Sequence, residues 1–269
     1  MLTVVKIGGS TLEEGVSQVF VEDLKNMLLS NEVVLVHGGG VEVTDFASKL
    51  GFEQKFVVSP RGFRSRYTDR ETAEVYTMVM VGKINKQLVS ALESRGIPAV
   101  GLSGLDGLLI KAERKKRLII LDERGRRRVI DGDYSGKIVD INASLLKLLL
   151  CNRYVPVVAP VAIGNEFELL NVDGDRAAAH IGGALKADAL VLLTDVEGVA
   201  ADGKLISKLT MSEAKEILPK IGHGMITKIY AAIEALEKGV KKVVIANGLE
   251  KTPISSSLEE RHGTVISNE

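Results

Sequence analysis

Short apolar runs alternate with longer amphipathic stretches along most of the chain. The run Leu2–Ile7 is rich in β-branched residues at consecutive positions, which is typical of a strand buried on both faces of a parallel sheet. Residues 13–29 then repeat their apolar positions with a helical period. The next run, Glu32–Val36, is again strand-like, and a helix is expected at 41–50. This β-α-β-α order predicts an α/β protein with a mainly parallel sheet.

The same alternation continues along the chain. The residues Thr68-Asp69-Arg70-Glu71 have the spacing of a capping box, which predicts the start of a long helix that reaches about Ser94. Its apolar stripe would be Met78, Val81, Ile84, Leu88 and Leu92. Further strands are expected at 99–102, 139–141, 155–159, 189–193, 243–246 and 263–266, and further helices at 143–150, 177–185, 211–218 and 225–237.

One basic segment interrupts this alternation. Between Leu108 and Ile130 the pattern becomes that of short strands with a turn at 123–125, which predicts a β-hairpin in which 111–121 pair with 127–130. Nine cations and three acids give residues 111–128 a local net charge of 9 − 3 = +6. The cations are Lys111, Arg114, Lys115, Lys116, Arg117, Arg124, Arg126, Arg127 and Arg128.

Composition excludes only a few broad classes of protein. The 269 residues carry 35 basic and 35 acidic side chains, so the net charge points to neither nucleic acid nor membrane. No apolar run approaches the roughly 18 residues of a membrane helix, and the amino terminus lacks a signal-peptide pattern, so we expect a cytoplasmic protein. Cys151 is the single cysteine and is expected to pack as a small hydrophobic residue. The length suits one large domain or two fused lobes.

Two glycine loops follow the first two predicted strands. Gly8-Gly9 comes after Leu2–Ile7, and Gly38-Gly39-Gly40 comes after Glu32–Val36 and His37. The carboxyl ends of parallel strands meet at one edge of a sheet, where ligands of open α/β proteins bind. Glycines before a helix let phosphate oxygens approach backbone N–H groups. Neither loop matches the Walker or GxGxxG patterns, so a tight turn is the alternative for each. His37 is expected to be a packed turn residue, because no second His or Cys stands at metal-ligand spacing.

Charged residues far apart in the sequence could meet beside these loops. Lys6 lies within an apolar strand, and Lys228 lies about one turn into the helix that Gly224 opens. The acids Asp173 and Asp175 precede a helix of small residues, where a helix cap is the ordinary interpretation. A buried carboxylate there could also hold both lysines and form a phosphate cluster. The alternatives are a snorkelling Lys6 and a solvated Lys228.

Six segments occur in a fixed order along the chain. They are Val4–Gly9, Val36–Gly40, Gly62–Arg64, Asn171–Asp175, Leu193–Gly198 and Gly224–Lys228. Together they resemble the amino-acid kinase family, closest to its acetylglutamate kinase branch, over nearly the whole chain. The resemblance implies an open, mainly parallel three-layer αβα sandwich of the carbamate kinase-like fold, with the β-hairpin as an insertion. It also implies two lobes, residues 1–170 for the amino-acid substrate and residues 171–269 for ATP.

The family's reaction would be ATP-dependent phosphorylation of a carboxylate to give an acyl phosphate. A carboxylate is already ionised at pH 7, so no general base is needed, and catalysis would rest on positioning and charge neutralisation. By family correspondence Lys6 and Lys228 are catalytic and Asp175 orients both. Mg²⁺ would arrive with ATP and be held mainly by the phosphates, with no metal site on the protein.

The same correspondence assigns binding roles. Arg64 would grip a substrate carboxylate in a bidentate manner, and the N–H groups of Gly9 and Gly39 would bind the transferred oxygens. Asp173 and Gly174 depart from the Asn-Val-Asn-Ala-Asp of many acetylglutamate kinases, and Asp173 receives no role. The full substrate set would be Gly39, Gly40, Arg64 and Asn171, and the ATP set Gly8, Gly9, Thr194, Asp195, Gly224 and Met225.

Further features are similar to those of archaeal lysine-biosynthesis kinases. The loop Gly62–Asp69 is longer than in acetylglutamate kinases, which pass almost directly from Arg to Val-Thr; residues 112–117 and 263–268 strengthen the likeness. Such enzymes phosphorylate α-aminoadipate or glutamate linked to an acidic LysW-type carrier protein, in lysine or arginine biosynthesis. The basic segment Arg114–Arg128 would steer that carrier, or its charge would only protect an edge hairpin. A homodimer is also expected.

Other interpretations stay open. A kinase of free N-acetylglutamate would turn over that compound without a carrier, and a regulatory module would bind ATP without releasing ADP. A UMP- or carbamate-type kinase is disfavoured because Arg64 and Asn171 match carboxylate binders. Nucleic-acid binding is disfavoured because no aromatic residues interleave with the basic run. Aminoadipate and glutamate differ by one methylene, which leaves the choice between them open.

Overall fold

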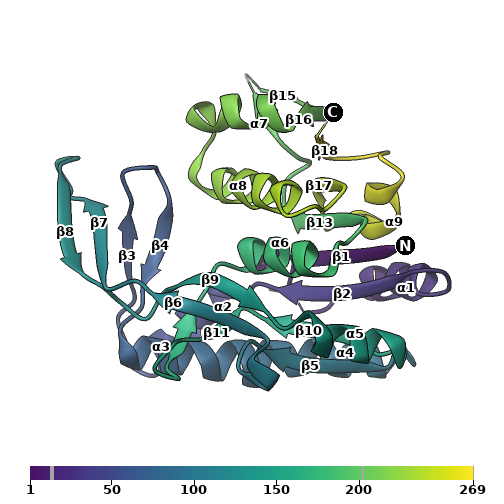
Figure 1. Cartoon of the computed structure of the whole chain (residues 1–269), viewed down its shortest axis with the longest axis horizontal. Helices are drawn as coiled ribbons and strands as arrows, with labels where there is room; N and C mark the ends of the chain where they lie inside the picture. Colours follow the sequence, from purple (N-terminus) through teal and green to yellow (C-terminus); the bar gives the residue numbers. More distant parts are fainter. Residues whose placement is uncertain (13–14, 202, 269) are drawn as a thin grey trace.

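The computed structural model describes residues 1–12, 15–201 and 203–268, and its centre is an eight-stranded sheet (Figure 1). All neighbouring strands in it run parallel except one pair, so the expected mainly parallel sheet is confirmed. Across the sheet the strands are β16 (Lys208–Thr210), β18 (Thr264–Ser267), β17 (Lys242–Asn247), β13 (Ala189–Thr194), β1 (Leu2–Ile7), β2 (Glu32–His37), β10 (Val155–Ala159) and β5 (Ala99–Ser103). The antiparallel pair is β17 and β18.

Helices cover both faces of this sheet and make three layers (Figure 1). Successive residues of a strand point to opposite faces, so Val4 joins one apolar core and Val5 the other. The first core lies under α5 (Ala143–Cys151), α6 (Gly174–Leu185), α7 (Met211–Ile217) and α8 (His223–Glu237). The second lies under α1 (Gln18–Met27), α2 (Gly40–Lys49), α3 (Arg70–Thr77), the π-helical segment Met78–Ile84, α4 (Asn85–Glu93) and α9 (Pro253–Leu258). Short 3₁₀ turns are Ser10–Leu12, Asp106–Leu108 and Leu218–Lys220.

Smaller sheets stand outside the central one. A four-stranded sheet has the order β12 (Leu169–Asn171), β11 (Val161–Ile163), β6 (Ile110–Arg114) and β9 (Gly136–Ile141). Three two-stranded sheets are β3 (Lys55–Val58) with β4 (Arg64–Tyr67), β7 (Arg117–Leu121) with β8 (Arg127–Asp131), and β14 (Ala200–Ala201) with β15 (Lys204–Leu205). The hairpins β3–β4 and β7–β8 project side by side from one end of the molecule (Figure 1).

The predicted β-hairpin insertion is confirmed only in part. Residues 117–121 pair with 127–131, as expected. Residues 110–114 do not extend that hairpin, because they pair antiparallel with β9 and parallel with β11. Strand β9 therefore belongs to the outer sheet. The prediction of a strand at 139–141 assumed that it would resume the α/β pattern of the central sheet, and this assumption was wrong.

Three local predictions were wrong. The first long helix begins at Gln18 and not near residue 13; residues 13 and 14 lie outside the described part of the chain. The cap of α3 is Asp69, whose side chain accepts from the Thr72 amide at 2.8 Å, so Thr68 does not form the predicted capping box. Cys151 is exposed at the end of α5 and does not pack as a hydrophobic residue.

Candidate active site

The two glycine loops touch each other at the carboxyl edge of the central sheet. Because Ile7 of β1 is in register with His37 of β2, the loops leave the sheet side by side. A Cβ atom on Gly9 would lie 3.0 Å from the Gly39 nitrogen, and one on Gly38 would lie 2.8 Å from the Gly9 nitrogen. Glycine is therefore required for two backbones to approach this closely. Gly39 caps α2, so the unpaired N–H groups of a helix start lie at this contact.

A carboxylate joins the two lysines that the sequence singled out. The Lys6 Nζ atom lies 2.8 Å from Asp175 Oδ1, and the Lys228 Nζ atom lies 3.0 Å from Asp175 Oδ2. Lys6 lies near the carboxyl end of β1, Asp175 lies in the first turn of α6, and Lys228 lies in the second turn of α8. The predicted cluster is therefore present, and Lys6 does not snorkel to the surface: it is 7% exposed.

The charges of this cluster stabilise one another. Burial alone would raise the pKa of Asp175, but the two ammonium groups outweigh it and lower that pKa to about 2. Burial opposes the Lys6 charge, and the Asp175 carboxylate outweighs it and raises the Lys6 pKa above its usual value. Lys6 and Asp175 are therefore both charged at neutral pH.

The two acids of the stretch Asn171–Asp175 have different roles. Asp173 is the helix cap, because its Oδ1 accepts from the Arg176 amide at 2.9 Å. Asp175 holds the lysines. The ordinary cap and the charged clamp, which the sequence left as alternatives, therefore occur together. Burial and the neighbouring Asp175 charge raise the pKa of Asp173.

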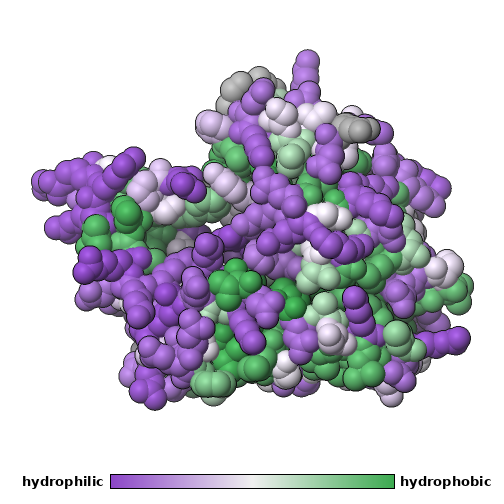
Figure 2. Space-filling view, viewed as in Figure 1, coloured by the Kyte–Doolittle hydropathy of each residue, from purple (hydrophilic) through white to green (hydrophobic). Residues whose placement is uncertain are grey.

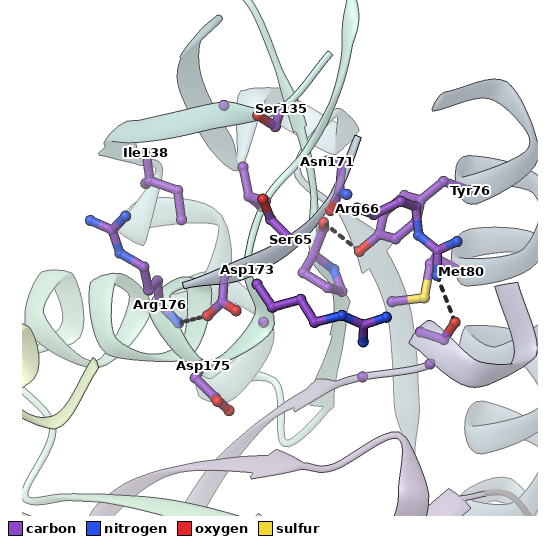
Figure 3. Close-up of a pocket in the computed structure, with 18 of the residues that line it drawn as sticks. Ser65, Arg66, Tyr76, Met80, Ser135, Ile138, Asn171, Asp173, Asp175 and Arg176 are labelled. Atoms are coloured by element: carbon purple, nitrogen blue, oxygen red, sulfur yellow. Dashed lines mark hydrogen bonds between the residues drawn. The ribbon is translucent and has the colours of Figure 1, made fainter. Parts of the chain in front are cut away.

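A cavity of about 300 Å³ opens beside the cluster (Figure 3). Figure 3 shows Arg66, Tyr76 and Met80 on one side of it and Asp173, Asp175 and Arg176 on the other. The predicted residues that line it are Lys6, Gly39, Gly40, Arg64, Asn171 and Asp175. Lys115, Ser135 and Ile138 from around the outer sheet close it further. The cavity thus joins the charged cluster to the second glycine loop.

The other predicted residues do not line this cavity. The Gly8 amide donates to the Leu193 carbonyl at 3.0 Å, which commits it to the sheet. Thr194 ends β13 and its hydroxyl donates to Asp195 at 3.1 Å. The first turn of α8 contains Gly224, which is exposed, and Met225, which packs on the core. The contact between Gly9 and Gly39 brings Gly9 to the cavity edge.

Arg66 is a candidate binding residue that the sequence analysis missed. The residue is buried, at 7% exposed, and its guanidinium donates to the Gly40 carbonyl at 2.8 Å, to Thr44 Oγ1 at 2.9 Å and to Gln54. No acidic side chain in the described part of the chain forms an ion pair with it. A buried cation without an acid at a cavity wall is suited to an anionic ligand.

The sequence carried a signal for Arg66. Arg66 is followed directly by Tyr67 and Thr68. This Arg-Tyr-Thr order resembles the Arg-Val-Thr order described above for acetylglutamate kinases, and no extra loop residues separate Arg66 from Thr68 as they separate Arg64 from it. The predicted Arg64 also lines the cavity, but it is exposed and its guanidinium lies over the Phe56 ring at 4.1 Å from the centroid. Asn171, at the end of β12, donates to Thr68 Oγ1 at 3.0 Å.

The described residues contain no group of three or more His, Cys, Asp or Glu side chains placed to hold a metal ion. A divalent cation at this site would therefore take most of its oxygen ligands from a bound phosphate. Among residues 1–12, 15–201 and 203–268, no helix combines the length and apolarity that crossing a bilayer requires.

Comparison with known proteins gives consistent results. Residues 1–247 match the model of the amino acid kinase family. The chain is 48% identical over 266 residues to the LysW-aminoadipate/LysW-glutamate kinase of Sulfolobus acidocaldarius, with 98% of this chain and all of that protein covered. The crystal structure of smu.665 from Streptococcus mutans has a TM-score of 0.81 at 26% identity, covering 100% of this chain and 99% of that one. Carbamate kinase from Giardia lamblia has a TM-score of 0.66 at 17% identity, covering 99% of this chain and 98% of that one, so the expected fold is confirmed.

Proposed function

The chain belongs to the amino acid kinase family, and from this premise we propose that it transfers the γ-phosphoryl group of ATP to a side-chain carboxylate. The observation that carries the proposal is the pair Lys6 and Lys228 on one carboxylate, Asp175, beside two abutting glycine loops. Two fixed ammonium groups and free backbone N–H groups suit a transferring phosphoryl group, whose negative charge spreads over its equatorial oxygens.

Each group has a defined task in this proposal. Lys6 and Lys228 neutralise charge on the transferring phosphoryl group and on the departing ADP. Asp175 takes no proton during the reaction; its pKa of about 2 keeps it anionic, and it keeps the two ammonium groups at a fixed separation. Gly9 and Gly39 present N–H groups to the transferred oxygens. Mg²⁺, when bound with ATP, neutralises phosphate charge, and the phosphates supply most of its ligands.

The acceptor is a dicarboxylic amino acid in this proposal. Its α-carboxylate and its α-nitrogen are held by Arg66, Arg64 and Asn171. Its side-chain carboxylate then reaches the phosphoryl group beside Lys6. The cavity supports an anionic ligand, because five of its lining residues are cations (Lys6, Arg64, Arg66, Lys115 and Arg176) and two are acids (Asp173 and Asp175). Residues 1–170 are proposed to hold this acceptor and residues 171–269, with Thr194, Asp195, Gly224 and Met225, the nucleotide.

We further propose that the acceptor is aminoadipate or glutamate linked to an acidic LysW-type carrier protein, in lysine or arginine biosynthesis in the cytoplasm. The nearly full-length similarity to a LysW-aminoadipate/LysW-glutamate kinase supports this substrate class. The surface beside the site supports it too. A second cavity of about 320 Å³ lies among β3–β4, β7–β8 and α8, and it shares Arg64, Lys115 and Arg176 with the first. A second cavity that adjoins the first one and reaches the projecting hairpins suits a substrate that is attached to another protein.

The β7–β8 hairpin suits an acidic protein partner. Polar side chains dominate the projecting hairpins at the left of Figure 2. Arg127 and Arg128 are exposed, and the exposed apolar residues Ile119 and Val129 face each other across the strands. Charged groups around a small apolar centre are typical of a protein-binding surface. The expected homodimer stays a prediction.

An ADP-release assay with free and carrier-linked acceptors side by side tests the proposal. We expect ADP release with carrier-linked aminoadipate or glutamate and much less with the free amino acids. Turnover of free N-acetylglutamate at an equal or greater rate would favour the acetylglutamate kinase alternative. ATP binding without ADP release under every acceptor would contradict the kinase proposal and favour a regulatory module.

A further inference from the structure

His37 joins the second glycine loop to three other elements. Its ring is fully buried at the end of β2, and both ring nitrogens have partners. The Nδ1 atom lies 3.0 Å from the Gly38 carbonyl oxygen, and the Nε2 atom lies 3.2 Å from the Asn85 side-chain nitrogen. Asn85 begins α4, and the same nitrogen lies 2.9 Å from the Val157 carbonyl of β10.

These partners determine which ring nitrogen carries the proton. The Asn85 NH₂ group can only donate, and the Asn85 oxygen accepts from the Lys86 ammonium at 3.2 Å, which fits this orientation of the amide. The His37 Nε2 atom must therefore accept, and Nδ1 carries the proton and donates to Gly38. Burial lowers the pKa of His37 to about 4, so the ring is neutral at pH 7.

The hydrogen bond to Gly38 fixes the peptide that leads into the anion site. In a planar trans peptide the carbonyl of Gly38 and the N–H of Gly39 point in opposite directions. Holding the Gly38 carbonyl on His37 therefore turns the Gly39 N–H away from the ring. Gly39 lines the cavity and caps α2.

The π-helical segment Met78–Ile84 supports the same loop from another side. A Cβ atom on Gly39 would lie 2.1 Å from Ile84 Cδ1 and 2.9 Å from Met80 Sδ, so these side chains occupy the space beside Gly39. A π-helical turn places more residues in each turn than an α-helix and is frequent at functional sites. Asn85 follows this segment directly and reaches His37.

We propose that His37 and Asn85 are positioning residues that set the orientation of the Gly38–Gly39 peptide, so that the Gly39 N–H faces the transferred phosphoryl oxygens. His37 touches neither nucleotide nor acceptor in this arrangement and acts through the peptide alone. The inference rests on the proposed phosphoryl transfer, because it assigns the origin of one of the hydrogen-bond donors in that site.

Two substitutions separate positioning from packing. In His37→Asn the side-chain nitrogen occupies the place of Nδ1 and keeps the donor to Gly38, whereas in His37→Gln the amide reaches the place of Nε2 and loses it. We expect His37→Gln to lower kcat by about 10- to 100-fold with the KM for ATP within about 3-fold, because one oriented donor is lost. We expect His37→Asn to keep kcat within about 3-fold of the parent. Equal losses in the two variants, or parental kcat in His37→Gln, would overturn the proposal.

Imidazole ¹⁵N NMR of the unsubstituted chain supplies a test that does not depend on the variants folding. The proposal requires a protonated Nδ1 and a bare Nε2 at pH 7, and the opposite tautomer would refute it. Its failure is distinguishable from failure of the proposed reaction. The reaction fails if the unsubstituted chain releases no ADP with any acceptor, whereas the positioning role fails on the tautomer or on the ratio between the two variants.

Discussion

Arg176 of α6 donates two hydrogen bonds to Glu234 of α8, with 2.9 Å between Nε and Oε2 in one of them. The link matters because α6 carries Asp175 and α8 carries Lys228. Both helices start at the same edge of the sheet, and the ion pair joins the first turn of α6 to the later half of α8. The distance between Asp175 and Lys228 therefore depends on a contact that lies outside the charged cluster.

Replacing Arg176 with Gln should lower both stability and turnover. We expect a loss on the order of 1–2 kcal/mol in the free energy of unfolding, since a half-buried charged hydrogen-bond pair is lost. The value of kcat should fall about 10-fold as Lys228 loses alignment. Urea denaturation and ADP release measure the two effects. Arg70→Gln, which breaks the exposed Arg70–Glu74 pair on α3, is the matched control and should change neither.

Lys6→Ala should reduce kcat by roughly 100-fold or more, the scale for loss of one preorganised group that stabilises charge in the transition state. Asp175 keeps Lys228 as its partner, so the variant should still fold. The control is Lys241→Ala, which removes an exposed lysine paired with Asp188. Near-normal turnover of the Lys6 variant would contradict the role proposed for Lys6.

Arg66→Gln should raise the KM for the acceptor at least about 10-fold while the KM for ATP stays unchanged, because a buried cation that would pair with a carboxylate of the acceptor is lost. Arg66→Lys keeps the charge but not the planar guanidinium, so its KM for the acceptor should lie between that of the parent and that of Arg66→Gln. Arg64→Gln should have a smaller effect, because Arg64 is exposed and lies over Phe56. If the Arg66→Gln variant bound the acceptor as the parent does, the acceptor site would have to be placed elsewhere.

Neutralising Lys116, Arg127 and Arg128 together should weaken carrier binding about 10-fold or more at low salt, and less as salt rises, because exposed charges are screened. Arg126 is best left in place, since its ion pair with Asp122 at 2.9 Å shapes the turn. A control triple of exposed lysines, at Lys147, Lys204 and Lys251, should have little effect. ATP affinity should be equal in all three proteins. Unchanged carrier affinity at low salt would contradict a role for this hairpin in docking.

The stability of the chain should fall as pH drops from about 6.5 to about 4. The His37 pKa is about 4 in the folded chain against an ordinary 6.5, so the unfolded chain binds the extra proton over this range and stability increases with pH. The contribution is on the order of 3 kcal/mol, fully present above pH 6.5. Asp175, with a pKa of about 2 against 3.8, adds a second loss only below about pH 4.

Urea denaturation at several pH values between 4.5 and 7 checks this expectation. The His37→Asn variant should show a shallower dependence than the parent. His180, whose pKa is also lowered to about 4, is present in both proteins, so its contribution cancels. Identical slopes for the two proteins would show that His37 does not titrate in this range.

The local pattern predicted seven of the eight strands of the central sheet, because each of these is a mainly apolar run, but it missed the edge strand β16 (Lys208–Thr210). The helix phase after Thr77 could not be predicted in the same way. The sequence stripe contained Met78 and Val81, but Met78 is 57% exposed, and Val79 and Met80 are buried in its place. A π-helical turn consumes an additional residue, so an α-helical count that is in phase with Leu88 and Leu92 is out of phase at the start of the turn, where Met78 lies. Leu88 and Leu92 are buried as predicted.

The candidate site was predictable where the chemistry is local to a motif. Lys6, Lys228 and Asp175 stood out as charges in apolar or glycine-bearing contexts, and they meet as expected. Arg66 was missed because its burial depends on Gly40, Thr44 and Gln54, which lie 12 to 26 residues away. The pairing of β6 with β9 and β11 was missed for a similar reason, because strand pairing across long separations leaves no periodic signal.

The unbroken central sheet restricts how the protein can open and close around a nucleotide. Strand β1, which carries Lys6, is hydrogen-bonded to β13 from Thr3 to Ile7, so the two halves of the chain share one continuous backbone ladder. A hinge motion that separates the two halves would have to break these backbone hydrogen bonds. Twisting of the sheet, in contrast, leaves these hydrogen bonds intact, so it is the motion that this architecture permits around a nucleotide.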